Sequence, residues 1–228
     1  MSAADNTGKA LVVLSGGQDS TTCLYWAIER FGRDNVSTLT FDYGQRHRIE
    51  LDCATRVSEH VQVRNTRLPI DTFAALGGDA LTDSDIEVQG QIAEENGLPN
   101  TFVPGRNLIF LTFAAAYAYR QGIGHVVTGV AETDYSGYPD CRDSTMQLLQ
   151  ETLRAGMETD IVIHAPLMHL SKKETVELCE RLGGLDAMAL THTCYNGERP
   201  PCGACPACEL RAKGFAEAGI PDPLLQTR

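Results

Sequence analysis

A short segment near the N-terminus combines glycines, hydroxyl groups and an acidic residue in a spacing that suits anion binding. Glycines let backbone N–H groups approach an anion, hydroxyls donate hydrogen bonds, and the N-terminus of a following helix adds partial positive charge. The segment is neither a Walker A loop, which needs a lysine, nor a G-x-G-x-x-G turn. The alternative is a plain glycine-rich turn in which Asp19 or Ser20 caps the helix. The residues expected to bind a phosphate-bearing ligand are Leu14, Ser15, Gly16, Gly17, Gln18, Asp19, Ser20, Thr21 and Thr22.

A second group of reactive side chains is a set of cysteines near the C-terminal end. Cys194, Cys202, Cys205 and Cys208 offer four thiolates within a short stretch, which matches the tetrahedral coordination of structural Zn²⁺. A ferredoxin-type iron–sulfur cluster would want another cysteine where Ala212 stands, and unliganded thiols are the remaining alternative. With four protein ligands, the metal would have no open position for water, so a structural role is expected.

Three cationic side chains stand at the starts of expected helices. A cation is poorly placed against the positive end of a helix dipole unless an anion lies between them, so Arg106 is a candidate for a phosphate oxygen. Lys172 and Lys173 follow Ser171 in a capping-box pattern and invite the same interpretation. Lys172 is slightly preferred, without a firm choice between the two. Solvated surface positions are the alternative for all three.

The segment of residues 134–142 follows an expected strand and carries carboxylate, tyrosine and arginine side chains that could bind a polar ligand. A carboxylate of Asp134 or Asp140 could accept two hydrogen bonds from a ring N–H and an exocyclic amine, Tyr135 could stack, and Arg142 could pair with a carboxylate. The alternative is a turn built from Asp and Pro. Asp42, at the end of another expected strand, is a candidate for the wall of a nucleoside pocket.

The elements that must position these side chains alternate between strand and helix. Short apolar runs alternate with segments of helical spacing, which predicts an α/β fold with a mostly parallel five-strand sheet covered by helices on both faces. Ligands of such folds bind at the carboxyl ends of the strands, where most of these candidates lie. The expected strands are residues 10–14, 36–41, 66–70, 125–130 and 161–164, and the expected helices are residues 20–31, 47–61, 108–119, 143–157, 171–182 and 210–218.

Length and charge limit the possible functions. The chain has 228 residues, enough for one domain over 1–228 with a cysteine-bearing segment at 191–218, and residues 77–100 read as a loop that orders over a ligand. With 19 basic and 30 acidic residues the net charge is −11, which disfavours a dedicated nucleic-acid binder. No secretory signal or membrane-spanning run is recognised, so we expect a cytoplasmic location without membrane partners.

Four sequence segments and the cysteine set together resemble a known family. The loop of residues 15–20 reads S-G-G-Q-D-S and is similar to the pyrophosphate loop (PP-loop) of the N-type ATP pyrophosphatases. Residues 41–47 (FDYGQRH), 103–107 (VPGRN) and 134–142 (DYSGYPDCR), together with the cysteine set, resemble the 7-cyano-7-deazaguanine synthase family, also called preQ0 synthases or the QueC family, of the queuosine pathway. These motifs span nearly the entire chain, and the resemblance implies the adenine nucleotide alpha hydrolase-like fold, which is Rossmann-like.

The resemblance also implies a reaction. Members of this family are ligases that use Mg²⁺-ATP to convert 7-carboxy-7-deazaguanine and ammonia into the nitrile, through adenylated carboxylate and amide intermediates. By this resemblance the chain is a homodimer with ATP, Mg²⁺ and one structural Zn²⁺ per chain, and Asp19, Arg106 and Lys172 are the catalytic candidates. Two rivals remain open: a PP-loop enzyme that modifies tRNA, and a non-enzymatic zinc-bearing nucleotide sensor.

Overall fold

Five parallel strands form the centre of the molecule. The computed structural model describes residues 8–45, 48–70, 72, 101–132 and 138–226, so the expected loop at 77–100 lies outside the described residues. The strand order is β3-β2-β1-β4-β5, with β1 central, and every neighbouring pair is parallel. The strands are β1 Ala10–Val13, β2 Val36–Asp42, β3 Arg64–Pro69, β4 His125–Val127 and β5 Val162–His164.

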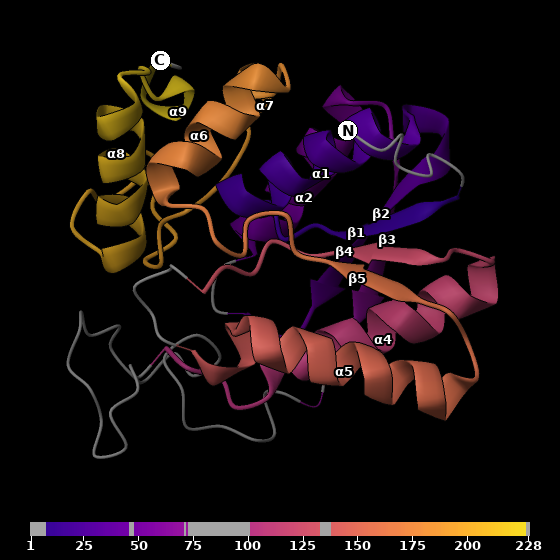
Figure 1. The fold of residues 1–228 in the computed structure, drawn as a ribbon. Coiled ribbons are helices and arrows are strands. Elements are labelled where there is room, and N and C mark those ends of the chain that lie inside the picture. The colour runs from indigo at the N-terminus through magenta and orange to yellow at the C-terminus, as the bar shows by residue number, and fades with distance from the viewer. Residues whose placement is uncertain (1–7, 46–47, 71, 73–100, 133–137, 227–228) are drawn as a thin grey trace.

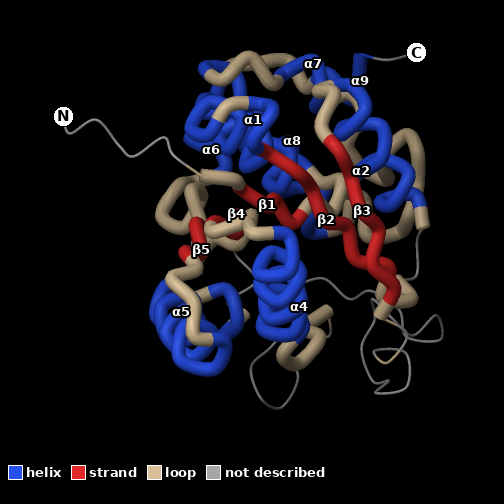
Figure 2. Tube along the Cα trace, turned by 90° about the vertical axis from the view of Figure 1, so that its right-hand side faces the viewer, coloured by secondary structure: helices blue, strands red, loops and turns tan. Residues whose placement is uncertain are grey.

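Helices cover both faces of this sheet (Figures 1 and 2). Helices α1 and α2 lie on one face, α4 and α5 on the other, and α6 packs against both α1 and α8 near the C-terminus. The helices are α1 Gln18–Phe31, α2 Ile49–His60, α4 Arg106–Gln121, α5 Asp143–Met157, α6 Lys172–Arg181, α7 Leu185–Met188, α8 Pro206–Ala218 and α9 Pro223–Gln226, with 3-10 turns at Arg33–Asn35 and Pro139–Cys141.

The central strand explains why its sequence is apolar throughout. Side chains alternate between the two faces of a strand. Leu11 of β1 joins the core under α4 and α5, whereas Ala10 and Val12 join the core under α1 and α2. All three are fully buried, because helices exclude water from both faces. The prediction of a parallel sheet covered on both sides is therefore confirmed.

The predicted elements are present, with differences at their ends. Helix α8 begins at Pro206 and not at residue 210, because Pro206 occupies the first helical position, where its missing N–H costs no hydrogen bond. Strand β4 ends at Val127 and not at residue 130, although the N–H of Thr128 still donates to the carbonyl of His164 in β5 at 2.9 Å. The short helices α7 and α9 were not predicted, because a single turn gives too few residues for a periodic pattern.

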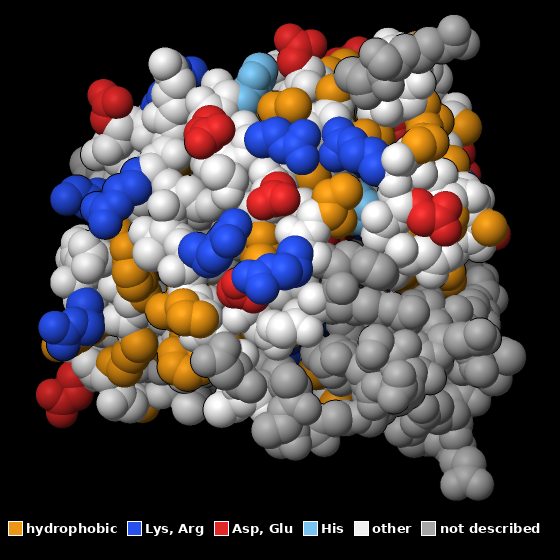
Figure 3. Space-filling model, turned by 180° about the vertical axis from the view of Figure 1, so that it is seen from behind, with side chains coloured by type: hydrophobic (Ala, Val, Ile, Leu, Met, Phe, Trp, Pro, Cys, Tyr) orange, Lys and Arg blue, Asp and Glu red, His pale blue; other side chains and the backbone are white. Residues whose placement is uncertain are grey.

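Charged side chains of both signs are mixed on one face of the molecule. On the face seen in Figure 3, lysine and arginine side chains lie among acidic and apolar ones and do not form one continuous basic area. Within the part of the chain that the structure describes, no helix combines the length and the apolar character that crossing a membrane requires.

Candidate active site

The loop of residues 14–20, called the phosphate loop from here on, lies at the point where the strand order reverses. The chain leaves β1 toward β2 on one side of the sheet, while β4 lies on the other side of β1. In open α/β sheets this arrangement opens a crevice beyond the strand ends. A cleft of about 340 Å³ lies here, between the loop that follows β1 and residues 128–131 that follow β4. This volume lies in the range typical of small-molecule sites.

The two glycines of the loop have different tasks. Gly16 has φ +87° and is packed so tightly that an added Cβ would lie 2.4 Å from the backbone oxygen of Glu50. Gly17 is the N-cap of α1 in extended conformation, and among the described residues no side chain caps this helix end. The first N–H groups of a helix have no intrahelical acceptor. They are therefore available to an anion in the cleft.

Hydrogen bonds among the hydroxyl groups hold the loop in shape. Ser15 and Ser20 are joined through their Oγ atoms at 3.0 Å, and the N–H of Ser15 donates to Ser20 Oγ at 3.2 Å. Thr21 and Thr22 donate their hydroxyl protons to backbone carbonyls of the loop and first turn, at 2.8 and 2.9 Å. Both threonines are buried and do not line the cleft.

An ion pair links the loop to α6. Lys172 Nζ lies 2.7 Å from Asp19 Oδ2, and the two side chains are 15% and 25% exposed. Both residues line the cleft. Lys173 is exposed and pairs with Glu177 on the surface at 3.6 Å. Of the two lysines that the sequence left open, the structure brings Lys172 to the phosphate loop.

Aromatic side chains form another wall of the cleft. Phe41 and Phe110 are stacked, with ring centroids 4.5 Å apart, and Tyr43 lies 5.1 Å from Phe110. The guanidinium of Arg106 lies over the Tyr43 ring at 6.0 Å. All four residues line the cleft. A flat aromatic ligand could stack in such a wall.

The N-terminus of α4 is fixed by a buried carboxylate. Asp140 is 5% exposed, and its Oδ2 accepts the N–H of Asn107 at 3.0 Å. This negative charge at the helix end compensates for Arg106, which is the first residue of α4. The structure thus places Asp140 as a support for the helix end, with an oxygen already occupied. Beside it, Tyr138 and Cys141 line the cleft.

Glu50 is a cleft residue that sequence reasoning did not single out. It lies in the first turn of α2, half-buried. Burial raises the pKa of its carboxyl to about 7, against a smaller lowering by the Arg106 guanidinium. An acidic group whose pKa lies near neutrality in a cleft is a functional candidate on physical grounds.

Several predicted residues lie elsewhere. Asp42 does not line the cleft, and its carboxylate pairs with Arg48 at 2.9 Å. Arg142 is exposed before α5 and also lies outside the cleft lining. Asp134 and Tyr135 fall outside the described residues. Gly16 contributes through the packing of its backbone rather than through the cleft surface.

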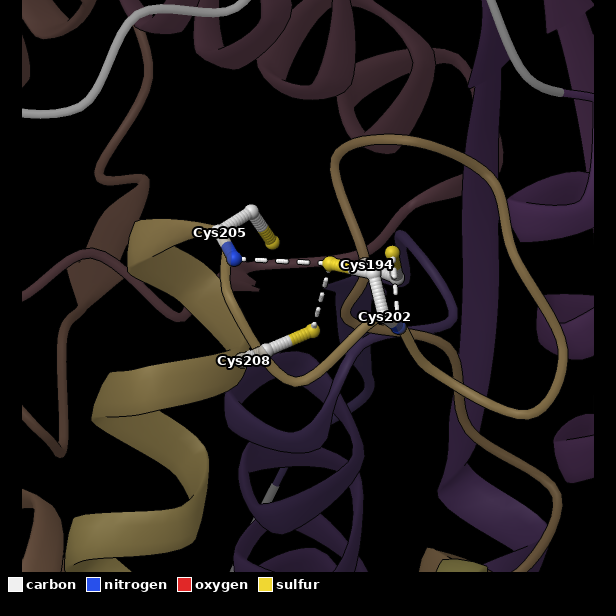
Figure 4. Close-up of side chains that lie close together, drawn as sticks. All are labelled: Cys194, Cys202, Cys205 and Cys208. Atoms are coloured by element: carbon white, nitrogen blue, oxygen red, sulfur yellow. Dashed lines mark hydrogen bonds between the residues drawn. The ribbon is translucent and has the colours of Figure 1, made fainter.

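The four predicted cysteines converge, as Figure 4 shows. The Sγ atoms of Cys194, Cys202, Cys205 and Cys208 all lie within 4.8 Å of one another. Tetrahedral Zn²⁺ with Zn–S bonds of 2.3 Å requires sulfurs about 3.8 Å apart, and Cys202 and Cys208 are 3.9 Å apart. The donor set and its spacing therefore fit a metal such as zinc.

Backbone N–H groups support these sulfurs. Ala204 N–H donates to Cys202 Sγ at 3.5 Å and Tyr195 N–H to Cys205 Sγ at 3.4 Å. Hydrogen bonds from the backbone N–H groups of Ala204 and Cys205 lower the pKa of the Cys202 thiol to about 7. Burial raises the pKa of the Cys205 thiol. Such N–H donors also stabilise metal-bound thiolates and orient them.

The cysteine site and the phosphate loop share a short connecting segment. The N–H of His192 donates to the carbonyl of Gly16 at 2.9 Å, and His192 Nε2 lies 2.8 Å from the carbonyl oxygen of Cys194. His192, Cys194 and Tyr195 all line the cleft. The segment that begins the cysteine site thus also forms one wall beside the loop.

Three cleft residues, Tyr43, Glu50 and His192, were not predicted from the sequence because their roles depend on tertiary contacts. Tyr43 belongs to a recognised motif, but its contact with Phe110 depends on how α4 crosses the sheet. Glu50 follows the same motif closely, and only its burial marks it out. His192 lies just before the first cysteine, and its hydrogen bond to Gly16 joins distant parts of the chain.

Comparison with families and relatives gives a consistent result. The family model described as "Queuosine biosynthesis protein QueC" matches residues 9–219. A 7-cyano-7-deazaguanine synthase of Chromobacterium violaceum is 65% identical over 218 residues, covering 96% of this chain and 93% of that protein. A protein of the same name from Laribacter hongkongensis is 61% identical over 216 residues, covering 95% and 93%.

A solved structure is similar in fold. It is titled as the crystal structure of a predicted subunit of tRNA methyltransferase from Methanocaldococcus jannaschii, and it aligns with a TM-score of 0.50 at 16% identity. The alignment covers 76% of this chain and 75% of that one. At this identity the likeness concerns the fold alone, the parallel sheet with flanking helices.

Proposed function

The chain belongs to the family described as queuosine biosynthesis protein QueC, and on this premise we propose that it synthesises 7-cyano-7-deazaguanine. In this proposal it is an ATP-dependent ligase that uses 7-carboxy-7-deazaguanine and ammonia. The observation that carries the proposal is one cleft in which an uncapped helix end, Lys172 and an aromatic wall meet. The relatives that carry this name cover nearly the entire chain.

The phosphate loop is proposed to hold the β- and γ-phosphates of ATP. The open N–H groups of α1, together with Lys172 and Arg106, provide positive potential where pyrophosphate leaves. Fixed donors and cations at the position of developing charge lower the barrier of such a step. Mg²⁺, when bound, would neutralise phosphate charge further, and Asp19 is the loop carboxylate that could hold it once Lys172 turns to the phosphates.

The base is proposed to stack against Tyr43 and Phe110. The substrate carboxylate would then face the α-phosphate, with Arg106 close to both anions. A carboxylate oxygen attacks the α-phosphorus, and the bond to the bridging oxygen of pyrophosphate breaks. Ammonia displaces AMP from the resulting acyl-adenylate to give the amide. The amide oxygen is adenylated in turn, and loss of AMP and protons gives the nitrile.

Adenylation explains why such a site needs no nucleophilic side chain. An oxide or hydroxide leaves carbon poorly, whereas the same oxygen leaves readily as part of AMP. The chain therefore acts by holding the reactants in line and by stabilising charge. Asp19, Arg106 and Lys172 are its proposed catalytic residues, and residues 14–20 the proposed nucleotide-binding segment.

The zinc site and the assembly remain part of the proposal. Structural Zn²⁺, one per chain, fits the convergent thiols. All eight cysteines are free of disulfide bonds, which is what a reducing cytoplasm favours. A homodimer, small-molecule substrates, and the absence of nucleic-acid and membrane partners complete the proposal.

The deciding experiment follows nucleotide and base together. Purified protein is incubated with Mg-ATP, ammonium and 7-carboxy-7-deazaguanine labelled with ¹⁸O in its carboxylate, and products are identified by mass spectrometry. We expect nitrile, AMP and pyrophosphate, with ¹⁸O in the phosphate of AMP, because each adenylated oxygen leaves with that group. Lys172→Ala should reduce the rate by about 100-fold.

Lys173→Ala is the matched control. It removes the same side chain one residue further along α6, where the lysine is exposed, and its rate should stay within about twofold. Accumulation of amide without nitrile would mark an amide-forming enzyme and contradict the proposal. ATP left intact would contradict it too, and would favour a nucleotide sensor. Tight binding of bulk tRNA at moderate salt would favour a tRNA-modifying enzyme.

A further inference from the structure

The proposed reaction requires a base near the substrate nitrogen. The amide nitrogen carries two protons and the nitrile nitrogen carries none, so both must leave as ATP is converted to AMP and pyrophosphate. Ammonia likewise has to lose a proton after it bonds to the acyl carbon. Phosphate-loop donors and cations do not accept these protons, so the site needs a group that does.

Glu50 lies where such a group is needed. Its backbone packs directly behind Gly16 of the phosphate loop, and Glu50 is one of the residues that line the cleft, together with Tyr43 and Arg106. Among the described residues, the carboxyl has no hydrogen-bond or ion-pair partner, and Arg106 is the charged group that acts on it. Its oxygens are therefore open to a ligand in the cleft.

Other titratable groups of the cleft are already engaged. The carboxylate of Asp19 is paired with Lys172 at 2.7 Å. The hydroxyl of Tyr138 is bonded to Thr101 at 2.6 Å, and burial raises its pKa. His192 is held through Nε2 at the Cys194 carbonyl. Glu50 is thus the cleft carboxylate that remains open to accept a proton.

We propose that Glu50 is the general base that removes protons from the substrate nitrogen, a role that rests on the proposed function. After adenylation of the amide oxygen, the carboxylate takes one N–H proton and a neutral imidate forms. Glu50 passes this proton to water and takes the second. The electron pair of that N–H bond becomes the third carbon–nitrogen bond, and the carbon–oxygen pair leaves with AMP. In the amide-forming half, the same carboxylate takes the proton that the ammonia nitrogen must lose once it has bonded to the acyl carbon and AMP has left.

The titration of Glu50 suits this role. The pKa of about 7 leaves the group half ionised at neutral pH, where a general base is most effective. The groups that face Glu50 are Arg106 from α4, Tyr43 after β2, and Cys53 on the same helix. Burial raises the pKa of the Cys53 thiol, and the Glu50 carboxylate raises it further. Activity should therefore rise with pH through about 7.

The test uses the carboxamide of the same deazaguanine as substrate, so that no ammonia titrates in the assay. Glu50→Gln keeps the shape of the side chain and removes its basicity. We expect nitrile formation to fall by about 100-fold to 10,000-fold. Adenylation, measured as exchange of labelled pyrophosphate into ATP, should stay within about threefold. The rise of the wild-type rate through pH 7 should be absent from the variant.

Glu59→Gln is the matched control, the same change on the exposed end of α2, and it should match wild type in every readout. If wild type makes nitrile and Glu50→Gln equals it, or keeps the rise through pH 7, Glu50 is not the base. Loss of adenylation to the same extent as nitrile formation would indicate a structural role and overturn the proposal. If wild type makes no nitrile, the proposed function fails and this role falls with it.

Discussion

Replacing either glycine of the phosphate loop by alanine should have very different costs. Gly16 has φ +87°, and its added Cβ would lie 2.4 Å from the Glu50 carbonyl oxygen and 2.7 Å from the Ala54 nitrogen. Both are backbone atoms of α2, which cannot move aside as the end of a flexible side chain can. Gly17 has φ −86°, and its Cβ would lie 3.5 Å from its neighbours, which is ordinary contact.

The expected magnitudes follow from these distances. A left-handed conformation costs a non-glycine residue about 1–2 kcal/mol, and overpacking adds about 1–3 kcal/mol, so Gly16→Ala should lose about 2–5 kcal/mol. Gly17→Ala should lose about 1 kcal/mol, because alanine is a poorer N-cap than glycine. For a chain of this size each kcal/mol lowers Tm by about 2–4 °C.

The assay is urea unfolding and thermal melting of both variants beside wild type. Trp26, the single tryptophan, lies half-buried in α1 and reports the unfolding of this region by fluorescence. Circular dichroism provides the second probe, and coincident curves support a single transition. If Gly16→Ala proves as stable as Gly17→Ala, the argument from the Cβ distances and from φ is refuted.

Other expected outcomes concern the metal, a buried ion pair and a half-buried histidine. Cys202→Ser should lower bound zinc and Tm together, since a structural metal contributes folding energy; full zinc by elemental analysis with unchanged melting would contradict the metal assignment. Asp222→Asn should cost about 3 kcal/mol in urea unfolding, because it leaves the Arg211 charge, 3% exposed and paired at 2.7 Å, without its partner; a loss below about 1 kcal/mol would argue against a buried charge there. Burial lowers the pKa of His164 to about 4 from 6.5, aided by His125. Between pH 6.5 and 4 the unfolded chain therefore binds a proton at His164 that the folded protein does not bind. The free energy of unfolding should fall as the pH drops from about 6.5 to about 4. His164→Gln should flatten this slope, and an unchanged slope in the variant would refute the cause.

Features that depend on local sequence could be predicted. The phosphate loop and the cysteine set each lie within one short stretch, and each strand and helix is marked by its own local pattern of apolar residues, so spacing alone indicates them. The capping box of α6 is confirmed in the same way, with Ser171 and Glu174 bonded reciprocally. These features require no knowledge of which strands are neighbours.

Features that depend on distant contacts could not be predicted. Asp140 is predicted to contact the substrate base; that its Oδ2 accepts a hydrogen bond from the N–H of Asn107, which lies 33 residues earlier, could not be predicted. The choice between Lys172 and Lys173 depended on which side of α6 packs against the loop. The perturbed pKa of Glu50 arises from burial, which no short pattern encodes. In each case the packing of elements that are distant in the sequence decided which side chains met.

The ion pair between Asp19 and Lys172 joins residues 153 positions apart, and His192 closes over Gly16 from still further along the chain. The candidate site therefore joins the phosphate loop to residues that lie more than 150 positions further along the chain. As the chain emerges from the ribosome, the loop between β1 and α1 is made early, and 153 further positions must be translated before Lys172 can pair with Asp19. A chain interrupted before Lys172 would carry the phosphate loop without the ion pair to α6 and without the part of the cleft wall that residues 192–195 form.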